Sequence, residues 1–277
     1  MINTTCYGKW ILAGEHAVLR GHPALVFPLR DKHVNLRYEA APHPLRTSCS
    51  GTLGEPLLQC FKTTLDQALA RWNRSLAAYT GTLHLDANLP LGMGMGASAA
   101  ICMLVARFCV AEGLLPRDEQ FIFARTLEDR FHGRSSGLDL MGVSSEHGVC
   151  FVQGTATKIE QTWSPKWTVS CCGTQGLTSE CIDKVQKIWT HDPCRAQQID
   201  QQMSDCVQAA QAALVMTGDN ARSQLADAMN GAADCFAQWG LITEALAEHM
   251  QQKREQGAIA VKPTGSGGGG CVVSLWP

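Results

Sequence analysis

The chain has 277 residues, of which 45% are hydrophobic and 17% charged, and its formal net charge is −2. This length allows one large domain or two ordinary ones, and the apolar fraction is that of a globular protein, which excludes wholesale disorder. A net charge so close to zero argues against binding to nucleic acid or to an anionic membrane by bulk electrostatics, so we expect neither as a partner.

The cysteines favour a reducing compartment. There are 13 of them, an odd number, and the sequence contains no C-x-x-C pair. We therefore expect free buried thiols that behave as small hydrophobic residues, and not a disulfide framework. The N-terminus lacks the pattern of a signal peptide. The uncharged stretch 87–106 is about long enough to span a membrane, but Pro90 and three glycines in its first half favour a turn followed by a buried helix. We expect a cytoplasmic protein.

The first half of the chain alternates strands and helices. Strands are expected at 9–12, 24–28 and 33–39, where Val34, Leu36 and Tyr38 alternate with polar residues. A loop rich in proline and serine should cover 42–54, followed by a helix at 57–78 and a strand at 82–89. The run 97–111 is apolar on all sides, which is typical of a buried helix. A helix at 118–131, a loop at 132–139 and a strand at 148–153 complete this half.

The second half is richer in helix. We expect a strand at 168–172, three helices rich in alanine and glutamine at 197–216, 220–238 and 242–256, and strands at 258–262 and 271–275. Strands first and a helix cluster later indicate an α+β protein in two lobes. The change in composition after Gly154 predicts an N-terminal domain at 1–158 and a C-terminal domain at 159–277.

Glycines alternate at Gly92, Gly94 and Gly96, between a predicted strand and a predicted helix. Glycine allows close approach to the backbone, and a helix N-terminus adds unpaired N–H groups and the positive end of its dipole, so this segment suits phosphate. A glycine-rich turn without a ligand is the alternative. No lysine follows, which excludes a P-loop. A dinucleotide fingerprint fits only formally, because the acidic residue that it needs falls at the end of the helix, at Glu112.

A second run of glycines, 265–270, precedes the last predicted strand. A flexible linker would join two units, but only one strand follows. We therefore expect a loop whose backbone is approached by another group. Near the start of the chain, Lys9 heads a predicted strand, and Glu15 and His16 follow it on a turn.

Together, three segments resemble the motifs of the GHMP kinases. Residues 8–21 are similar to the first motif, 90–100 to the second (P-x-G-x-G-x-G-S-S-A-A) and 261–271 to the third (K-x-T-G-A-G-G-G-G-C). Their order and spacing agree, so the resemblance covers essentially the whole chain. Residues 14–19, together with 128–139, which match E-x-x-x-H-G-x-x-S-G-x-D, look most like the mevalonate kinase branch of the family.

The resemblance implies a fold and a reaction. The fold is the two-lobed α+β GHMP kinase fold, with an S5-like N-terminal lobe and a ferredoxin-like C-terminal lobe. The reaction is ATP-dependent phosphorylation of a small-molecule hydroxyl, foremost the 5-hydroxyl of mevalonate. The family also suggests a homodimer.

Site residues follow from the same resemblance. Asp139 is expected as the catalytic base with Lys9 beside it, and Ser98 and Glu128 as ligands of Mg²⁺, an ion that prefers oxygen. The ATP phosphates would be held by a continuous segment: Gly92, Met93, Gly94, Met95, Gly96, Ala97 and Ser98. The acceptor would be contacted by five residues: Lys9, Glu15, His16, Thr178 and Gly265.

Each role has a simpler reading. Asp139 could only cap a helix that begins at Leu140, and Met93 and Met95 could be core residues. The sequence also departs from the family at Ala97, which replaces a serine, and at Leu140, which replaces an asparagine. Residues 173–178 keep Thr178 but contain no lysine or arginine, which puts the acceptor's identity in doubt.

Other functions remain open at this point. The chain could be a phosphomevalonate or homoserine kinase, although a phosphorylated acceptor should need more basic residues. It could also be a catalytically silent sensor that keeps the fold to bind a metabolite, or, more remotely, a dinucleotide oxidoreductase.

Overall fold

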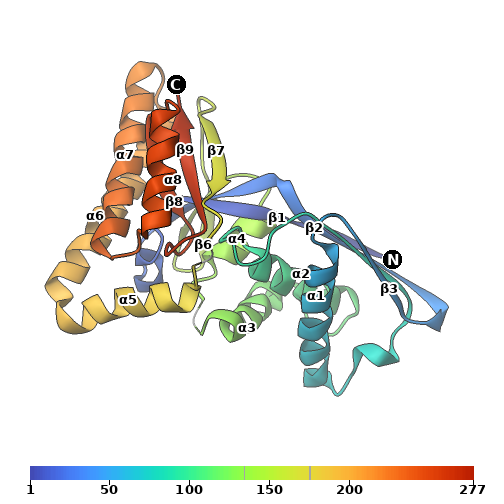
Figure 1. Cartoon of the computed structure of the whole chain (residues 1–277). Helices are drawn as coiled ribbons and strands as arrows, with labels where there is room; N and C mark the ends of the chain where they lie inside the picture. The colour runs from blue at the N-terminus through green and yellow to red at the C-terminus, as the bar shows by residue number, and fades with distance from the viewer. Residues whose placement is uncertain (134, 175) are drawn as a thin grey trace. The chain divides into compact units, whose positions relative to one another are not determined.

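The computed structural model describes residues 1–133, 135–174 and 176–277. These residues form two compact units, each assembled from separate stretches of the chain. The first unit consists of Met1–Lys9, Pro28–Leu91 and Gly96–Ser145, and the second of Trp10–Phe27, Gly92–Met95 and Glu146–Pro277. Each unit is described by itself below, with the elements labelled as in Figure 1.

A six-stranded sheet has the order β3-β4-β2-β5-β6, and β1 also pairs with β2. Its strands are β1 (Ile2–Ala13), β2 (Ala24–Pro44), β3 (Arg46–Ser50), β4 (Thr80–Ala87), β5 (Val149–Val152) and β6 (Thr155–Lys158). Strand β2 contributes residues to both units. Its first residues pair with β5 in the second unit, and residues 34–44 pair with β4 in the first. The predicted alternation holds, since Val34, Leu36 and Tyr38 are all buried.

Four helices belong to the first unit, namely α1 (Gly54–Leu69), α2 (Ala97–Ala111), α3 (Gln120–His132) and α4 (Leu138–Ser144). Helix α2 occupies the predicted range and is contacted by the other three. It is buried on nearly all sides, because its side chains are almost all apolar. Arg107 is only partly buried, and its guanidinium donates to the carbonyl of Thr5 at 2.6 Å.

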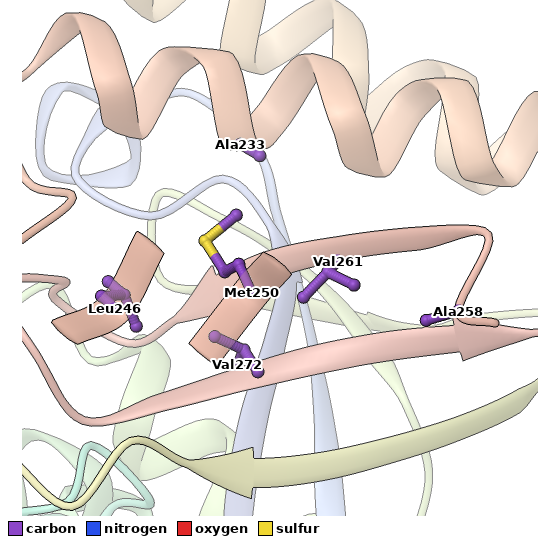
Figure 2. Packing of buried hydrophobic residues seen from close by; sticks show 6 residues of the cluster. All are labelled: Ala233, Leu246, Met250, Ala258, Val261 and Val272. Carbon is purple, nitrogen blue, oxygen red and sulfur yellow. The ribbon is translucent and has the colours of Figure 1, made fainter. Parts of the chain in front are cut away.

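The second unit contains a three-stranded antiparallel sheet with the order β7-β9-β8. Its strands are β7 (Lys166–Cys171), β8 (Ala260–Thr264) and β9 (Cys271–Trp276), and its helices are α5 (Thr178–His191), α6 (Pro193–Val215), α7 (Asp219–Gln238) and α8 (Glu244–Glu255). Helices α6 and α7 run side by side, and α7 and α8 pack on the sheet (Figure 1). Figure 2 shows the core between them, formed by Ala233, Leu246, Met250, Ala258, Val261 and Val272.

Short 3-10 turns complete the described elements at Ala17–Arg20, Ala70–Trp72, Leu76–Ala78 and Arg117–Glu119. Among the helices described, none is long and apolar enough to cross a membrane.

One predicted element was wrong, and some elements were not predicted. The proline- and serine-rich loop expected at 42–54 contains the end of β2 and all of β3, because β3 pairs in parallel with β4 over Arg46–Ser50. Helix α5 was not predicted at all, although Cys181 and Val185 form a buried stripe at helical spacing.

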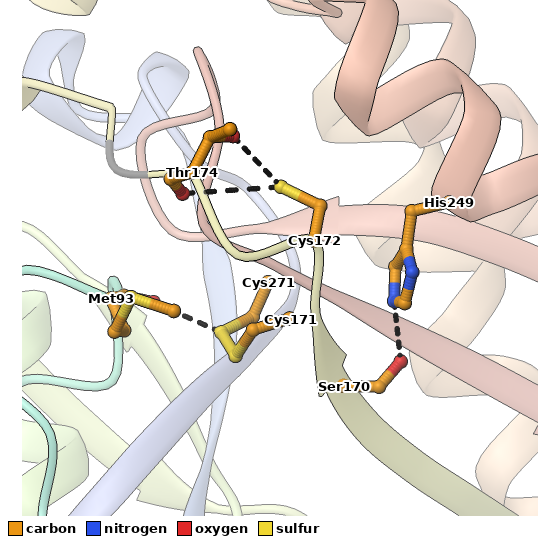
Figure 3. The surroundings of a disulfide bond; sticks show 7 residues. All are labelled: Met93, Ser170, Cys171, Cys172, Thr174, His249 and Cys271. Atoms are coloured by element: carbon orange, nitrogen blue, oxygen red, sulfur yellow. Dashed lines mark hydrogen bonds between the residues drawn. A yellow bond between two sulfur atoms is a disulfide. The ribbon is translucent and has the colours of Figure 1, made fainter.

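The expectation of free thiols was also wrong for two cysteines. Cys171 and Cys271 form a disulfide across 100 residues of sequence, with their Cα atoms 3.9 Å apart (Figure 3). They are register partners where β7 ends and β9 begins, so sheet pairing brings them together. An odd cysteine count carries no information about such a pairing. Cys172, the next residue, remains a thiol beside Thr174.

The α+β class predicted from the sequence is confirmed. Strands and helices alternate in the N-terminal half up to β6, and the helix cluster follows in the C-terminal half, as the residue patterns indicated.

Candidate active site

In the first unit, Lys9 and Asp139 form an ion pair with 2.8 Å between Nζ and Oδ1. Strand β1 supplies the lysine, which is 1% exposed, and helix α4 supplies the aspartate, which is 35% exposed. Gly137 caps α4 in a left-handed conformation, and Asp139 is the second residue of the helix. The alternative reading of Asp139 as the cap of a helix beginning at Leu140 is therefore wrong. The pair places a partly accessible carboxylate beside a buried cation.

Glu128 is buried in the same unit, on helix α3. The hydroxyl of Ser135 donates a hydrogen bond to its Oε2 atom. Burial raises the pKa of Glu128 well above its usual value, and the nearby carboxylate of Asp139 raises it further, while Ser135 and Lys9 act in the opposite direction. Two carboxylates and one ammonium thus share this region, which we call the Lys9 cluster (Lys9, Glu128, Ser135 and Asp139). Such a region would be stabilised by an added cation.

Helix α2 begins beside the Lys9 cluster. Its cap, Gly96, has a φ of +86°, and a Cβ atom there would lie 2.8 Å from Val143 and 2.9 Å from the Cγ atom of Lys9. Glycine is therefore required for the lysine stem to lie against the start of the helix. Ala97 is buried and Ser98 half-buried in the first turn, where backbone N–H groups have no partner within the helix.

In the second unit, His16 follows β1 on a turn, with a left-handed φ of 58°. Its Nε2 atom lies 2.8 Å from the carbonyl oxygen of Ser266, and its ring packs edge-on against Trp239. Burial lowers the pKa of His16 to about 4, so the ring is neutral at pH 7. A carbonyl can only accept, which makes Nε2 the protonated nitrogen.

Glu15 and Lys262 form a second buried ion pair, 2.6 Å between Oε1 and Nζ, and neither side chain is more than 1% exposed. Lys262 also donates to the carbonyl oxygen of Ile11 at 3.3 Å. The hydroxyl of Thr264 accepts from the backbone N–H of Ile11 at 2.7 Å and donates to its carbonyl. These bonds hold the third motif against the end of β1. We call Glu15, His16, Lys262 and Ser266 the His16 cluster.

Sequence reasoning missed Lys262 and Thr264 as members of the site. Both occupy fixed positions of the K-x-T-G pattern in the third motif, which was the available signal. A lysine with no exposed surface needs a buried partner, but only the fold shows that the partner is Glu15.

The two glycine runs meet within the second unit. A Cβ atom on Gly265 would lie 3.2 Å from the carbonyl oxygen of Gly94, and one on Gly94 would lie 3.4 Å from that of Thr264. The Thr178 hydroxyl lies 3.3 Å from that of Ser266. Gly92 and Gly94 are exposed, Met93 is half-buried and Met95 is buried.

The structure thus distributes the predicted residues over both units. Lys9, Gly96, Ala97, Ser98, Glu128 and Asp139 belong to the first, and Glu15, His16, Gly92, Met93, Gly94, Met95, Thr178 and Gly265 to the second.

Comparison with known proteins finds a family model that matches part of the chain. Residues 58–146 match the family model described as the N-terminal domain of GHMP kinases. A mevalonate kinase of Pyrococcus horikoshii is 26% identical over 300 residues, covering 97% of this chain and 87% of that protein. The alignment with a mevalonate kinase of Thermococcus sibiricus, at 28% identity over 202 residues, covers 71% of this chain but only 60% of that relative.

Solved structures show the same fold. The mevalonate kinase of L. major in complex with R-mevalonate has a TM-score of 0.79 at 22% identity and covers 99% of this chain and 87% of its own. That of Methanococcus jannaschii has a TM-score of 0.76 at 17% identity, covering 100% of this chain and 90% of its own. A galactokinase of Lactococcus lactis, with a TM-score of 0.72 at 14% identity, covers 99% and 85%. Likeness at these identities shows the fold and leaves the acceptor open.

Proposed function

This chain belongs to the GHMP kinase superfamily, and we propose that it transfers the γ-phosphoryl group of ATP to the 5-hydroxyl of mevalonate. The observation that carries the proposal is the ion pair between Lys9 and Asp139, a partly accessible carboxylate held by a buried ammonium. Relatives that match along 97% of the chain and are called mevalonate kinases support this acceptor over others.

The Lys9 cluster supplies the proton chemistry. Asp139 accepts the proton of the acceptor hydroxyl as its oxygen attacks the γ-phosphorus and the bond to the oxygen bridging the β- and γ-phosphates breaks, releasing ADP. The ammonium of Lys9, 2.8 Å from the Asp139 carboxylate, stabilises negative charge that develops on the attacking oxygen. Because the lysine is buried, its field is weakly screened by water.

ATP requires a divalent cation, and the donor set of this chain fits Mg²⁺. A buried carboxylate on Glu128 and a hydroxyl on Ser98 are oxygen ligands, which this hard ion prefers. Because burial and Asp139 raise the pKa of Glu128, a nearby cation would stabilise its ionised carboxylate. We propose Glu128 and Ser98 as ligands. When bound, the ion would neutralise charge on the ATP phosphates.

Backbone N–H groups would bind the phosphates themselves. We propose that Gly92–Ser98 wraps them, because its exposed glycines and the start of α2 present donors and the positive end of a helix dipole. Met93 and Met95 flank these glycines and contribute their backbone amides. Gly265, which lies against Gly94, would support the same segment.

The His16 cluster and Thr178 are proposed to contact the acceptor. A neutral His16 and the hydroxyl of Thr178 offer hydrogen bonds, while the charge of Glu15 is matched by Lys262. These side chains form a polar cluster with balanced charge. It suits a small hydroxy acid better than a phosphorylated acceptor, which would call for added basic residues.

Three further expectations remain predictions: a homodimer, a cytoplasmic location, and domains at 1–158 and 159–277. The sheets favour the domain boundary, since the six-stranded sheet ends with β6 at Lys158 and the three-stranded sheet begins with β7 at Lys166, although the compact units divide after Ser145.

A coupled ADP-release assay with Mg²⁺–ATP tests the function. Mevalonate, phosphomevalonate, homoserine and galactose are offered separately, and the product is identified by mass spectrometry. We expect ADP release with mevalonate and one added phosphate on the product. Release only with another acceptor would identify a different kinase of the superfamily. Binding of ATP without release from any acceptor would favour the catalytically silent sensor.

A further inference from the structure

Ser135 lies in the loop between α3 and α4, and its buried hydroxyl has two partners. It donates to Oε2 of Glu128 and accepts from the backbone N–H of Gly137 at 3.0 Å. A hydroxyl carries a single hydrogen, so the N–H at its oxygen leaves that hydrogen for the carboxylate. The hydroxyl therefore bridges the Gly137 N–H and the Glu128 carboxylate.

The backbone of Ser135 is anchored to the helix that carries Glu128. Its N–H donates to Oδ1 of Asp129 at 2.6 Å, and its carbonyl accepts from Nε of Arg125 at 3.0 Å. Both partners belong to α3. The hydroxyl therefore has a set position relative to Glu128, and its bond restricts rotation of the carboxylate.

Without this hydroxyl, another donor would attract Glu128. Lys9 acts electrostatically on Glu128, and its ammonium is bonded to Asp139 at 2.8 Å. A carboxylate that is free to rotate would compete with Asp139 for that ammonium. Ser135 keeps the two carboxylates on separate donors.

We propose that Ser135 is a positioning residue for the divalent cation that accompanies ATP, because its hydroxyl holds Oε2 of Glu128 and leaves Oε1 to bind the cation. This inference rests on the proposed function, in which Glu128 is a ligand of that cation. The family pattern does not specify Ser135, since the serine of E-x-x-x-H-G-x-x-S-G-x-D is Ser136. Partners that orient metal ligands typically change metal affinity 10- to 100-fold when they are removed.

The test measures cation binding directly, without an acceptor. Mn²⁺ is titrated into the full-length protein saturated with a non-hydrolysable ATP analogue, and free Mn²⁺ is followed by electron paramagnetic resonance. We expect Ser135→Ala to weaken Mn²⁺ binding about 10-fold or more. Ser135→Thr, which keeps the hydroxyl, should restore most of the affinity. Ser144→Ala is the matched control, because that hydroxyl only donates to backbone carbonyls on α4 and should leave affinity unchanged.

Steady-state kinetics give a second readout. In Ser135→Ala, the Mg²⁺ concentration for half-maximal rate should rise about as much as the Mn²⁺ dissociation constant, while kcat at saturating Mg²⁺ changes only a few-fold. A loss of kcat at unchanged Mg²⁺ dependence would overturn the proposal, as would unchanged Mn²⁺ affinity in a folded variant. If Ser135→Ala fails to fold, Ser135→Cys, a weaker donor, takes its place under the same criteria. A protein that binds Mn²⁺ with the analogue but phosphorylates no mevalonate would contradict the proposed acceptor and leave the test of Ser135 intact.

Discussion

At the scale of single residues, the candidate site depends on side chains that each contact a specific partner. Lys9 lies against Asp139, Lys262 against Glu15, and His16 against a carbonyl oxygen. Resemblance to the family motifs predicted Lys9, Glu15, His16 and Asp139 as site residues. Lys262 and Ser135 were not predicted, because only the structure shows which side chains they contact.

Asp139→Asn tests the assignment of the base. The amide keeps the size of the side chain but cannot accept a proton, so we expect turnover to fall by roughly two to four orders of magnitude. ATP should still bind, because Gly92–Ser98 is unchanged. Turnover is measured by ADP release and binding by calorimetry. Turnover near that of the wild type would exclude Asp139 as the base.

His16 should make stability depend on pH. Its pKa is about 4 in the folded protein and near 6.5 when exposed, so the unfolded chain binds the proton more readily. Stability is therefore fully present above pH 6.5 and falls by about 1.4 kcal/mol per unit of acidification between pH 6.5 and 4.

Urea unfolding at pH 7 and pH 5 gives the measurement. Between pH 7 and pH 5, the free energy of unfolding should fall by about 2 kcal/mol more in the wild type than in His16→Asn. Asparagine tolerates the left-handed backbone at this position but does not titrate. Equal losses in the two proteins would show that His16 is not buried in its neutral form.

At the scale of elements, sequence prediction succeeded where the hydrophobic pattern of a segment matches its burial in the fold. Helix α2 was predicted residue for residue, because a helix that is buried on all sides has an unbroken apolar sequence. Strand β3 was not predicted, because its exposed serines and arginine are typical of a loop. Only its pairing with β4 makes this segment a strand. Tertiary pairing overrides local preference in such segments.

The two ends of α2 offer a matched test of packing at the Lys9 cluster. Gly96 and Gly113 both have left-handed backbones, but a Cβ atom at Gly96 would collide with Lys9 and Val143, whereas nothing lies within 4 Å of one at Gly113. Gly113→Ala should cost about 1 kcal/mol of unfolding free energy for the backbone alone. Gly96→Ala should cost about 1–3 kcal/mol more and lower kcat by displacing Lys9. Chemical denaturation and ADP release measure the two effects, and equal costs at both positions would contradict the crowding at Gly96.

At the scale of the whole molecule, each unit is held together by contacts between residues that lie far apart in the sequence. The disulfide is the longest-range covalent example, joining Cys171 to Cys271 beside the end of the second glycine run. Figure 3 shows it near Met93 of the first run, whose carbonyl oxygen lies 3.1 Å from the sulfur of Cys271.

Removing this bond should destabilise the second unit. A loop of 100 residues loses much conformational entropy when it is closed in the unfolded chain, so we expect Cys271→Ser, or reduction, to lower the free energy of unfolding by about 2–5 kcal/mol. Urea unfolding with and without a reductant measures this. Cys194→Ser, which removes an exposed free thiol, should have no such effect. Alkylation of both Cys171 and Cys271 in unreduced protein, seen by peptide mass spectrometry, would show that the bond is absent.

The sequence by itself predicted the family resemblance, the α+β class and most residues of the proposed site, because motifs and hydrophobic periodicity are local properties of a chain. Only the tertiary structure decided which of these residues meet. The pairing of Glu15 with Lys262 spans 247 residues, and that of Cys171 with Cys271 spans 100. The hydrogen bond from Ser135 to Glu128 spans only 7 residues, yet it depends on how the loop folds back on α3. Such contacts arise from packing and strand register, which no single segment of sequence encodes.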